Sequence, residues 1–320
     1  MQLNTSLLAL WATLSNAASI PAKENLPTRR QDSNNQLVVM SYNLWQGGTN
    51  VNGYHEKQVR FILESGADVV GLQESVDGGH ATRLADALGW DVWASNKSAS
   101  ILSRHPIVER YGEASAGGGV RISINGDGED KKEINFWNSH LPAYPYGPYG
   151  FCNEGKSPEE VLEIEAESGR TRQMAELLAT MAAQIADSDN VPVLLTGDTN
   201  APSHLDYVEG LREKNCGIAG FGWPTSALPQ QAGLIDSYRV AHPDPVAVGG
   251  TTWSPIFPFS EGSTGTPEPQ DRIDFIYATK QLRVTASRTT VVGKPQPPPN
   301  EADNEWTSDH AAVLTWFELP

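Results

Sequence analysis

Short apolar runs that border an acid, an amide or an imidazole recur along this chain, and they constrain its fold more than any other feature. Continuous runs such as LVVMSY before Asn43 are typical of strands buried on both faces. Sheet folds bring the ends of strands together, so scattered segments of this kind predict one polar cluster. The residues at these positions are Asn43, Glu74, Asn138, His140, Asp198, Asn200, Asp274, Asp309 and His310.

The two ends of the 320-residue chain differ in character. Residues 1–19 are apolar with small residues at their end, which predicts a signal peptide; a buried N-terminal helix is the alternative. Residues 20–30 end in a dibasic pair and suggest a pro-segment, with an untrimmed tail as the alternative. No linker divides residues 31–320, so we expect one domain there, in a secreted protein. No later run is long enough for a transmembrane helix.

Charge and cysteine usage narrow the class of partner. The formal net charge is −16, and an acidic surface repels phosphate backbones, so long nucleic acid is disfavoured although a local basic groove would permit it. Cys152 and Cys216 are the only cysteines, and the sequence leaves their pairing open. Asn96-Lys97-Ser98 is a glycosylation sequon of the predicted secreted chain. We expect a monomer.

Apolar runs alternate with helical periodicity, which predicts an α/β fold with mixed sheets and helices outside them. Residues 144–149 (YPYGPY), 249–270 and 295–306 are expected to be loops. The expected helices are residues 55–64, 81–88, one that opens at Ser157-Pro158, 171–186 and a candidate at 205–214. The expected strands are residues 37–42, 68–72, 91–95, 99–103, 121–124 paired with 132–141, 191–197, 272–278 and 311–317.

The polar cluster combines ligands for a hard cation with groups for proton transfer. Amide and carboxylate oxygens suit Mg²⁺, although a lone Glu74 is more often a solvated loop acid. Asp198 and Asn200 stand two apart at a strand end, so they point to one side and can hold one water or phosphoryl oxygen. His310 with Asp274 would form a histidine–carboxylate pair, as a general base needs. A lone histidine such as His140 is more often structural.

Nine segments in order resemble the endonuclease/exonuclease/phosphatase superfamily of DNase-I-like metallo-phosphoesterases. They cover about residues 37–318. The resemblance implies a four-layer sandwich: two mixed sheets face to face, with helices on both outer sides. It also implies metal-dependent hydrolysis of a phosphoester. The segments are SYNLW, GLQES, ASILSRHPIV, WNSHL, LLTGDTNAPS, LIDSYR, GGTTWSP, RIDFIYA and SDHAAV.

The resemblance also implies roles for individual residues. Asn43, Glu74 and Asp309 would hold Mg²⁺ (or Mn²⁺ or Ca²⁺), with Glu74 the principal ligand. The catalytic set would be His140, Asp198, Asn200, Asp274 and His310. We expect Asn138, Asp236 and Trp253 to support the site. Arg121 either faces a phosphate or is an ordinary strand arginine, and we favour the second reading.

The substrate is constrained only loosely. Tyr144, Tyr146 and Tyr149 form an aromatic loop that would stack on a base or sugar, cage a choline-like cation, or pack on its own rings. With the acidic charge, we expect a small-molecule or lipid-derived phosphoester as substrate. The alternatives are a secreted DNase-I-like endonuclease and a non-catalytic binding protein on the same scaffold.

Overall fold

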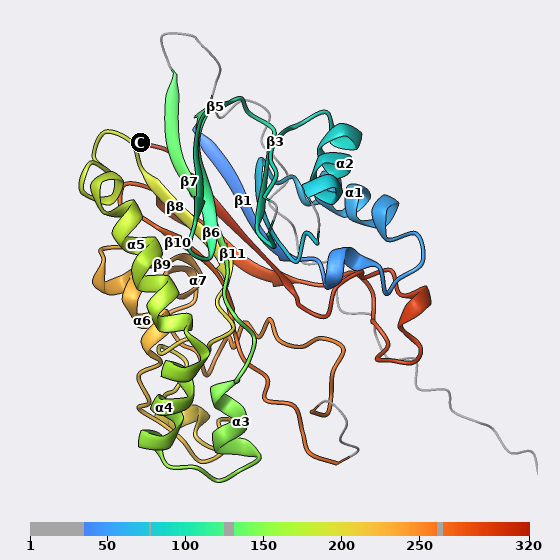
Figure 1. Cartoon of the computed structure of the whole chain (residues 1–320), viewed down its shortest axis with the longest axis vertical. Coiled ribbons are helices and arrows are strands. Elements are labelled where there is room, and N and C mark those ends of the chain that lie inside the picture. Colours follow the sequence, from blue (N-terminus) through green and yellow to red (C-terminus); the bar gives the residue numbers. More distant parts are fainter. Residues whose placement is uncertain (1–34, 77, 96, 125–130, 261–264) are drawn as a thin grey trace, which may run out of the picture. The chain divides into compact units, whose positions relative to one another are not determined.

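Two six-stranded mixed sheets pack face to face at the centre of the structure, a computed structural model (Figure 1). It describes residues 35–320 apart from 77, 96, 125–130 and 261–264. The predicted signal peptide, the pro-segment and Asn96 lie outside the described residues. Residues Asn34–Pro320 form one compact unit. Helices long and apolar enough to cross a bilayer are absent from the described ranges.

Each sheet contains one parallel pair of strands, β1–β2 in the first and β7–β8 in the second, and its other named pairs are antiparallel. The first sheet has the order β11 (Arg283–Thr290), β12 (Ala312–Glu318), β1 (Gln36–Asn43), β2 (Val69–Gln73), β4 (Ser100–Ser103) and β3 (Asp91–Trp93). The second has the order β5 (Ile107–Ala114), β6 (Gly117–Ile124), β7 (Lys132–His140), β8 (Val193–Asp198), β10 (Asp274–Ala278) and β9 (Ile235–Asp236).

Strand β1 shows why these runs are apolar throughout. Successive side chains of a strand point to opposite faces. Leu37 and Val39 therefore enter the core between the two sheets, and Val38 and Met40 enter the core between the first sheet and its helices. Both faces of the strand are covered, so a continuous apolar run stabilises it where an alternating pattern would not.

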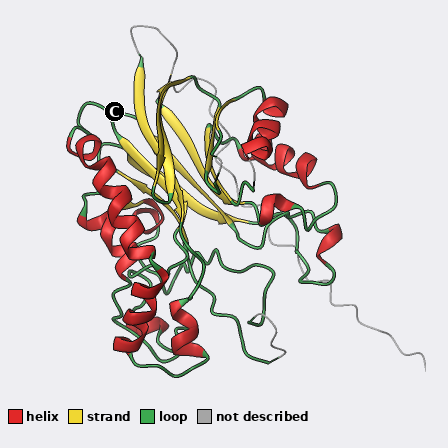
Figure 2. Cartoon of the chain, viewed as in Figure 1, coloured by secondary structure: helices red, strands yellow, loops and turns green. Residues whose placement is uncertain are grey.

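Helices cover the outer face of each sheet, which completes the predicted four layers (Figure 2). On the first sheet these are α1 (Tyr54–Ser65) and α2 (Gly78–Leu88), which bury Ile62 and Leu84. On the second sheet α5 (Arg170–Ala186) buries Met174, Leu177 and Met181. The other helices are α3 (Gly147–Cys152), α4 (Pro158–Ser168), α6 (Pro224–Gln231) and α7 (Ser237–Ala241), with 3-10 turns η1 (Gln46–Gly48), η2 (Glu209–Leu211) and η3 (Glu301–Asp303).

A disulfide settles the question that the sequence left open. Cys152 at the end of α3 is bonded to Cys216, with 5.2 Å between their Cα atoms. Beside it lies an aromatic cluster that includes Phe151, Phe221 and Trp223. The expected N-terminus of α4 is confirmed: Ser157 and Glu160 form a capping box.

Two expectations about local structure are wrong. The candidate helix at residues 205–214 is only the short turn η2, because the side chain of Asp206 turns inward to pair with Arg239 and Arg272. The loop at residues 144–149 gives way at Gly147 to helix α3, where Pro148 occupies the first turn and suits it. Strands β5 and β11 and helices α6 and α7 were not expected from the sequence.

Candidate active site

Strand register brings the predicted catalytic residues into one row across the ends of three strands of the second sheet. In β7 and β8, which are parallel, His140 is the register partner of Asp198. In β8 and β10, which are antiparallel, Asp198 is the register partner of Asp274. His310, just before β12, forms a bridge with Trp253 and joins the row from the first sheet. Three strand ends and one loop therefore meet at the same place.

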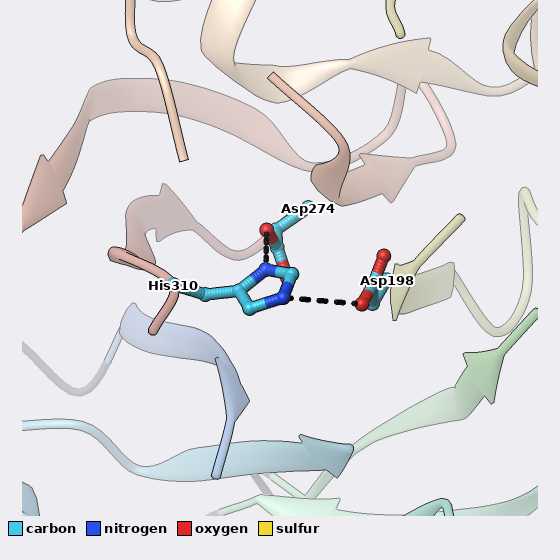
Figure 3. A group of neighbouring side chains, drawn as sticks. All are labelled: Asp198, Asp274 and His310. Carbon is cyan, nitrogen blue, oxygen red and sulfur yellow. Dashed lines mark hydrogen bonds and ion pairs between the residues drawn. The ribbon is translucent and has the colours of Figure 1, made fainter. Parts of the chain in front are cut away.

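His310 is held between two carboxylates (Figure 3). Its Nδ1 lies 2.8 Å from Oδ2 of Asp274, and its Nε2 lies 3.7 Å from Oδ2 of Asp198. All three side chains are buried. Burial lowers the pKa of His310, but the carboxylates of Asp274 and Asp198 outweigh it and raise the pKa well above its usual value. The two carboxylates therefore favour the protonated imidazole, and Asp274 orients it.

Asp198 lies at the centre of the row. Its Oδ2 accepts a hydrogen bond of 2.9 Å from Nδ2 of Asn43, and its Oδ1 accepts one of 2.8 Å from the backbone N–H of Asn200. Both imidazoles approach it, with Nε2 of His140 and Nε2 of His310 each 3.7 Å from Oδ2. Burial, with the charge of Asp274, raises the pKa of Asp198 to about 6. A carboxylate of this kind can accept a proton near neutral pH.

His140 is positioned by a serine that the motifs did not identify. Its Nδ1 lies 2.5 Å from Oγ of Ser98, and its Nε2 lies 3.4 Å from the side-chain nitrogen of Asn200. The same Oγ accepts the backbone N–H of Glu74 at 3.1 Å. Ser98 therefore links the predicted metal ligand to the second histidine. In the sequence Ser98 is the last residue of the predicted glycosylation sequon, and its contact with His140 was not predicted.

Glu74 and Asp309 offer carboxylates at the position predicted for a metal ion. Burial raises the pKa of Asp309 to about 7, and although His310 lowers it, the charge of Glu74 adds to the rise. Among the described residues, no donor lies within hydrogen-bond distance of Oδ1 of the buried Asp309, and Nε2 of His310 is 3.9 Å from it. Two acids that repel each other, one with an oxygen that accepts no hydrogen bond, fit a hard divalent cation, which would neutralise both.

The contacts of Asn43 make it a support for this position. Its Nδ2 donates to Glu74 at 3.4 Å as well as to Asp198, and its Oδ1 accepts the backbone N–H of Trp45 at 2.9 Å. Asp198, Asp274 and His310 offer a second arrangement, with ligand atoms within 4.8 Å of one another. In this second arrangement Nδ1 of His310 is already hydrogen-bonded to Asp274, whereas a metal ligand must offer a free lone pair.

The residues expected to support the site lie around it. Asn138 is buried between the sheets and donates to the backbone oxygens of Leu72 and Ser100, so it ties the two sheets together. Asp236 caps α7 and pairs with a buried arginine at 2.8 Å. The ring of Trp253 lies 4.9 Å from that of His310. Arg121 forms ion pairs with two glutamates of neighbouring strands and is an ordinary strand arginine.

A cavity of about 860 Å³ opens onto the row. Glu74, Asp198, Asn200, Asp309 and His310 all line it. No lysine or arginine is among the described residues of its wall. The aromatic loop lies here and also packs on itself, since two of its rings are 5.1 Å apart. Aromatic rings form much of the wall: Trp45, Tyr144, Tyr146, Tyr149, Trp253, Phe257 and Phe259.

The sequence did not identify Trp45, Phe257 or Glu268 as parts of this wall. Phe257 and Glu268 belong to the proline- and glycine-rich stretch, which has no periodicity that would mark single residues. Trp45 stands in the SYNLW segment, but Asn43 was the residue of that segment expected in the site. The backbone of Trp45 has φ 52°, an unusual value for a residue other than glycine, and its N–H donates to Oδ1 of Asn43.

Two packed mixed sheets with a histidine–carboxylate pair at their strand ends agree with the phosphoesterase-type fold that the sequence predicts. The sequence profile of the Endonuclease/Exonuclease/phosphatase family matches residues 40–310. The chain belongs to that family, and the predicted class, a phosphoester hydrolase, is confirmed with it.

Individual proteins also resemble this chain in sequence or in fold. "Uncharacterized protein F14F9.5" of Caenorhabditis elegans is 32% identical over 294 residues, which are 88% of this chain and 91% of that protein. The structure of truncated TDP2 from C. elegans has a TM-score of 0.52 at 18% identity, covering 88% of this chain and 98% of that one. The human Nocturnin catalytic domain with bound sulfate has a TM-score of 0.56 at 16% identity, covering 89% and 95%. At these identities the solved structures show the shared fold.

Proposed function

We propose that this protein is a secreted, divalent-metal-dependent hydrolase of a small or lipid-derived phosphoester. One observation carries the proposal: a cationic His310, a proton-accepting Asp198 and the facing acids Glu74 and Asp309 line the same cavity. A water molecule would attack phosphorus and pass its proton to Asp198, the ester P–O bond would break, and the leaving oxygen would take a proton from solvent.

The metal, held by Glu74 and Asp309, would supply charge stabilisation for the phosphoryl oxygens and the leaving group. His310 donates a hydrogen bond from Nε2 to an oxygen on phosphorus, and its positive charge stabilises the negative charge that develops there. Asp198 accepts the proton of the attacking water at Oδ2, which lies between the two imidazoles. His140 would bind a second phosphoryl oxygen through a protonated Nε2, and Ser98, at Nδ1, fixes its ring.

The wall of the cavity supports a small substrate over a nucleic acid. A polyanion needs lysine or arginine contacts along its backbone, and the described wall has none. The net charge of −16 adds repulsion at long range. An endonuclease remains the alternative, because an AP endonuclease from Archaeoglobus fulgidus has the same fold, with a TM-score of 0.53.

Release of p-nitrophenol from bis-p-nitrophenyl phosphate tests the reaction. We expect turnover with MgCl₂ that is lost with EDTA and falls by about two orders of magnitude or more in Glu74→Gln and His310→Ala. Asp86→Asn, an exposed acid of α2, is the matched control. Near-normal turnover by His310→Ala contradicts the mechanism, no turnover by the native protein favours the binding-protein alternative, and efficient plasmid nicking favours the endonuclease.

A further inference from the structure

Residues 252–254 lie between the two parts of the chain that carry the histidine–carboxylate pair. They belong to the GGTTWSP segment, of which only Trp253 was expected to support the site. Trp253 forms one isolated bridge with Asp271 and another with His310. Asp271 stands three residues before Asp274 in the sequence, so this short segment has one neighbour on each side of the pair.

The side chain of Thr252 reaches the start of β10. Thr252 is fully buried, and its Oγ1 accepts the backbone N–H of Ile273 at 3.0 Å and that of Asp274 at 3.2 Å. The neighbouring strand β9 pairs with β10 at Tyr277 and Ala278, and it ends before it reaches Asp274. The hydroxyl of Thr252 therefore takes the N–H of Asp274 in place of a strand neighbour.

The backbone of the same threonine binds the other half of the pair. The carbonyl oxygen of Thr252 accepts the backbone N–H of Ala311 at 2.8 Å, and Ala311 directly follows His310. Ser254 adds a contact on the other side, because its Oγ donates to the backbone oxygen of Asp309 at 2.7 Å. The residues before and after His310 are thus both hydrogen-bonded to this segment.

The pair needs a support of this kind because it crosses from one sheet to the other. Asp274 begins β10 of the second sheet, whereas His310 precedes β12 of the first. Ladder hydrogen bonds fix the spacing of strands within one sheet. The contact of 2.8 Å between Nδ1 of His310 and Oδ2 of Asp274 therefore depends on groups that reach both sheets. Thr252 is such a group, since its side chain binds one half of the pair and its backbone binds the other.

We propose that Thr252 is a positioning residue that holds the carboxylate of Asp274 against the imidazole of His310. Thr252 is not among the described residues that line the cavity, so it acts through Asp274 and does not contact the substrate. Its effect on the rate rests on the proposed function, whereas the positioning itself is a property of the folded protein. If the hydroxyl only satisfied two buried N–H groups, its loss would lower stability without a specific loss of kcat.

Thr252→Val tests the positioning, because it removes the acceptor and keeps the branched shape of the side chain. With bis-p-nitrophenyl phosphate and MgCl₂ we expect kcat to fall about tenfold or more, since a small displacement of a reacting group slows the reaction strongly, while KM stays within about threefold. Thr252→Ser keeps the hydroxyl and should restore kcat to within about threefold of native. In the control Thr279→Val, a buried hydroxyl that accepts the N–H of Val193 at 3.0 Å is lost just beyond the other end of β10, and native kcat should remain.

Proton NMR at a fixed pH gives a readout that does not depend on turnover. The proton between Nδ1 of His310 and Oδ2 of Asp274 should give a signal far downfield, and its loss in Asp274→Asn assigns it. We expect this signal to shift or disappear in Thr252→Val and to stay unchanged in Thr279→Val. In kinetics, Thr252→Val added to Asp274→Asn should lower kcat little further, because its effect passes through Asp274.

The outcomes separate the positioning role from the proposed function. Native kcat in a folded Thr252→Val variant, an equal loss of kcat in Thr279→Val, or no recovery in Thr252→Ser overturns the positioning role and leaves the hydrolase intact. If the native protein does not hydrolyse the ester, the proposed function fails and the NMR signal decides alone: its change in Thr252→Val supports the positioning, and an unchanged signal overturns it. If Thr252→Val does not fold, Thr252→Ala removes the same acceptor, leaves room for a water molecule, and is tested with the same expectations.

Discussion

Replacing Asp274 by asparagine tests the pairing on which the reacting histidine depends. Nδ1 of His310 and Oδ2 of Asp274 are 2.8 Å apart, and both side chains are buried. At an effective dielectric constant of about 20, their attraction is roughly 6 kcal/mol, and the cost of burying both charges offsets several kcal/mol of it. A net loss of about 3 kcal/mol corresponds to roughly two orders of magnitude in rate. We therefore expect kcat to fall about 100-fold in Asp274→Asn.

The pH dependence of kcat should also change in Asp274→Asn, in a direction that the structure specifies. Asp274 raises the pKa of His310, so it keeps the imidazole charged to higher pH. Without it the pKa falls, and activity that needs the charged form is lost at lower pH, so the alkaline limb of kcat moves down. If Asp274 acts only through His310, the double variant Asp274→Asn/His310→Ala should have nearly the same kcat as His310→Ala alone. A folded Asp274→Asn variant within threefold of native kcat, with an unshifted alkaline limb, refutes the reasoning.

Three further predictions concern stability, each measured by urea unfolding. Arg170→Leu should lower the free energy of unfolding by about 3–5 kcal/mol, because it leaves the buried carboxylate of Glu165 without its ion-pair partner. Loss of an exposed ion pair lowers it by less than about 1 kcal/mol. Reducing Cys152–Cys216 should cost about 4 kcal/mol, since it opens a loop of 64 residues' separation. Burial raises the pKa of Asp271 to about 6, so this carboxyl group lowers the stability progressively between about pH 4 and pH 6. Asp271→Asn should remove that contribution and gain up to about 3 kcal/mol at pH 7, and a slope of stability against pH equal to that of the native protein contradicts it.

The sequence predicted the layers of this fold because burial leaves a local record. Residues 37–42 are apolar on both faces, and β1 does lie between two cores. The amphipathic pattern of residues 171–186 likewise predicted α5, which buries Met174 and Met181 against the second sheet. Elements without such a record were missed. Strand β11, an edge strand with mostly polar residues, is one of them.

The sequence predicted those residues of the candidate site that lie at the ends of apolar strands. Asp198 ends one apolar run and Asp274 begins another, and the sheet register makes them neighbours. Ser98 and Glu268 have no such position. Ser98 is identified by its contact with His140, 42 residues away in the sequence, and Glu268 by its contact with Trp253, 15 residues away. A pairing between loops of this kind depends on the folded geometry, and composition or periodicity does not record it.

The central claim is that one divalent ion and the imidazole of His310 act on the same phosphorus. A crystal of the protein grown with Mn²⁺ and inorganic phosphate tests it through the anomalous signal of the metal. We predict one strong peak between the carboxylates of Glu74 and Asp309, with a phosphate oxygen within hydrogen-bond distance of Nε2 of His310. A peak bound instead by Asp198, Asp274 and His310, or phosphate bound away from that imidazole, contradicts the account.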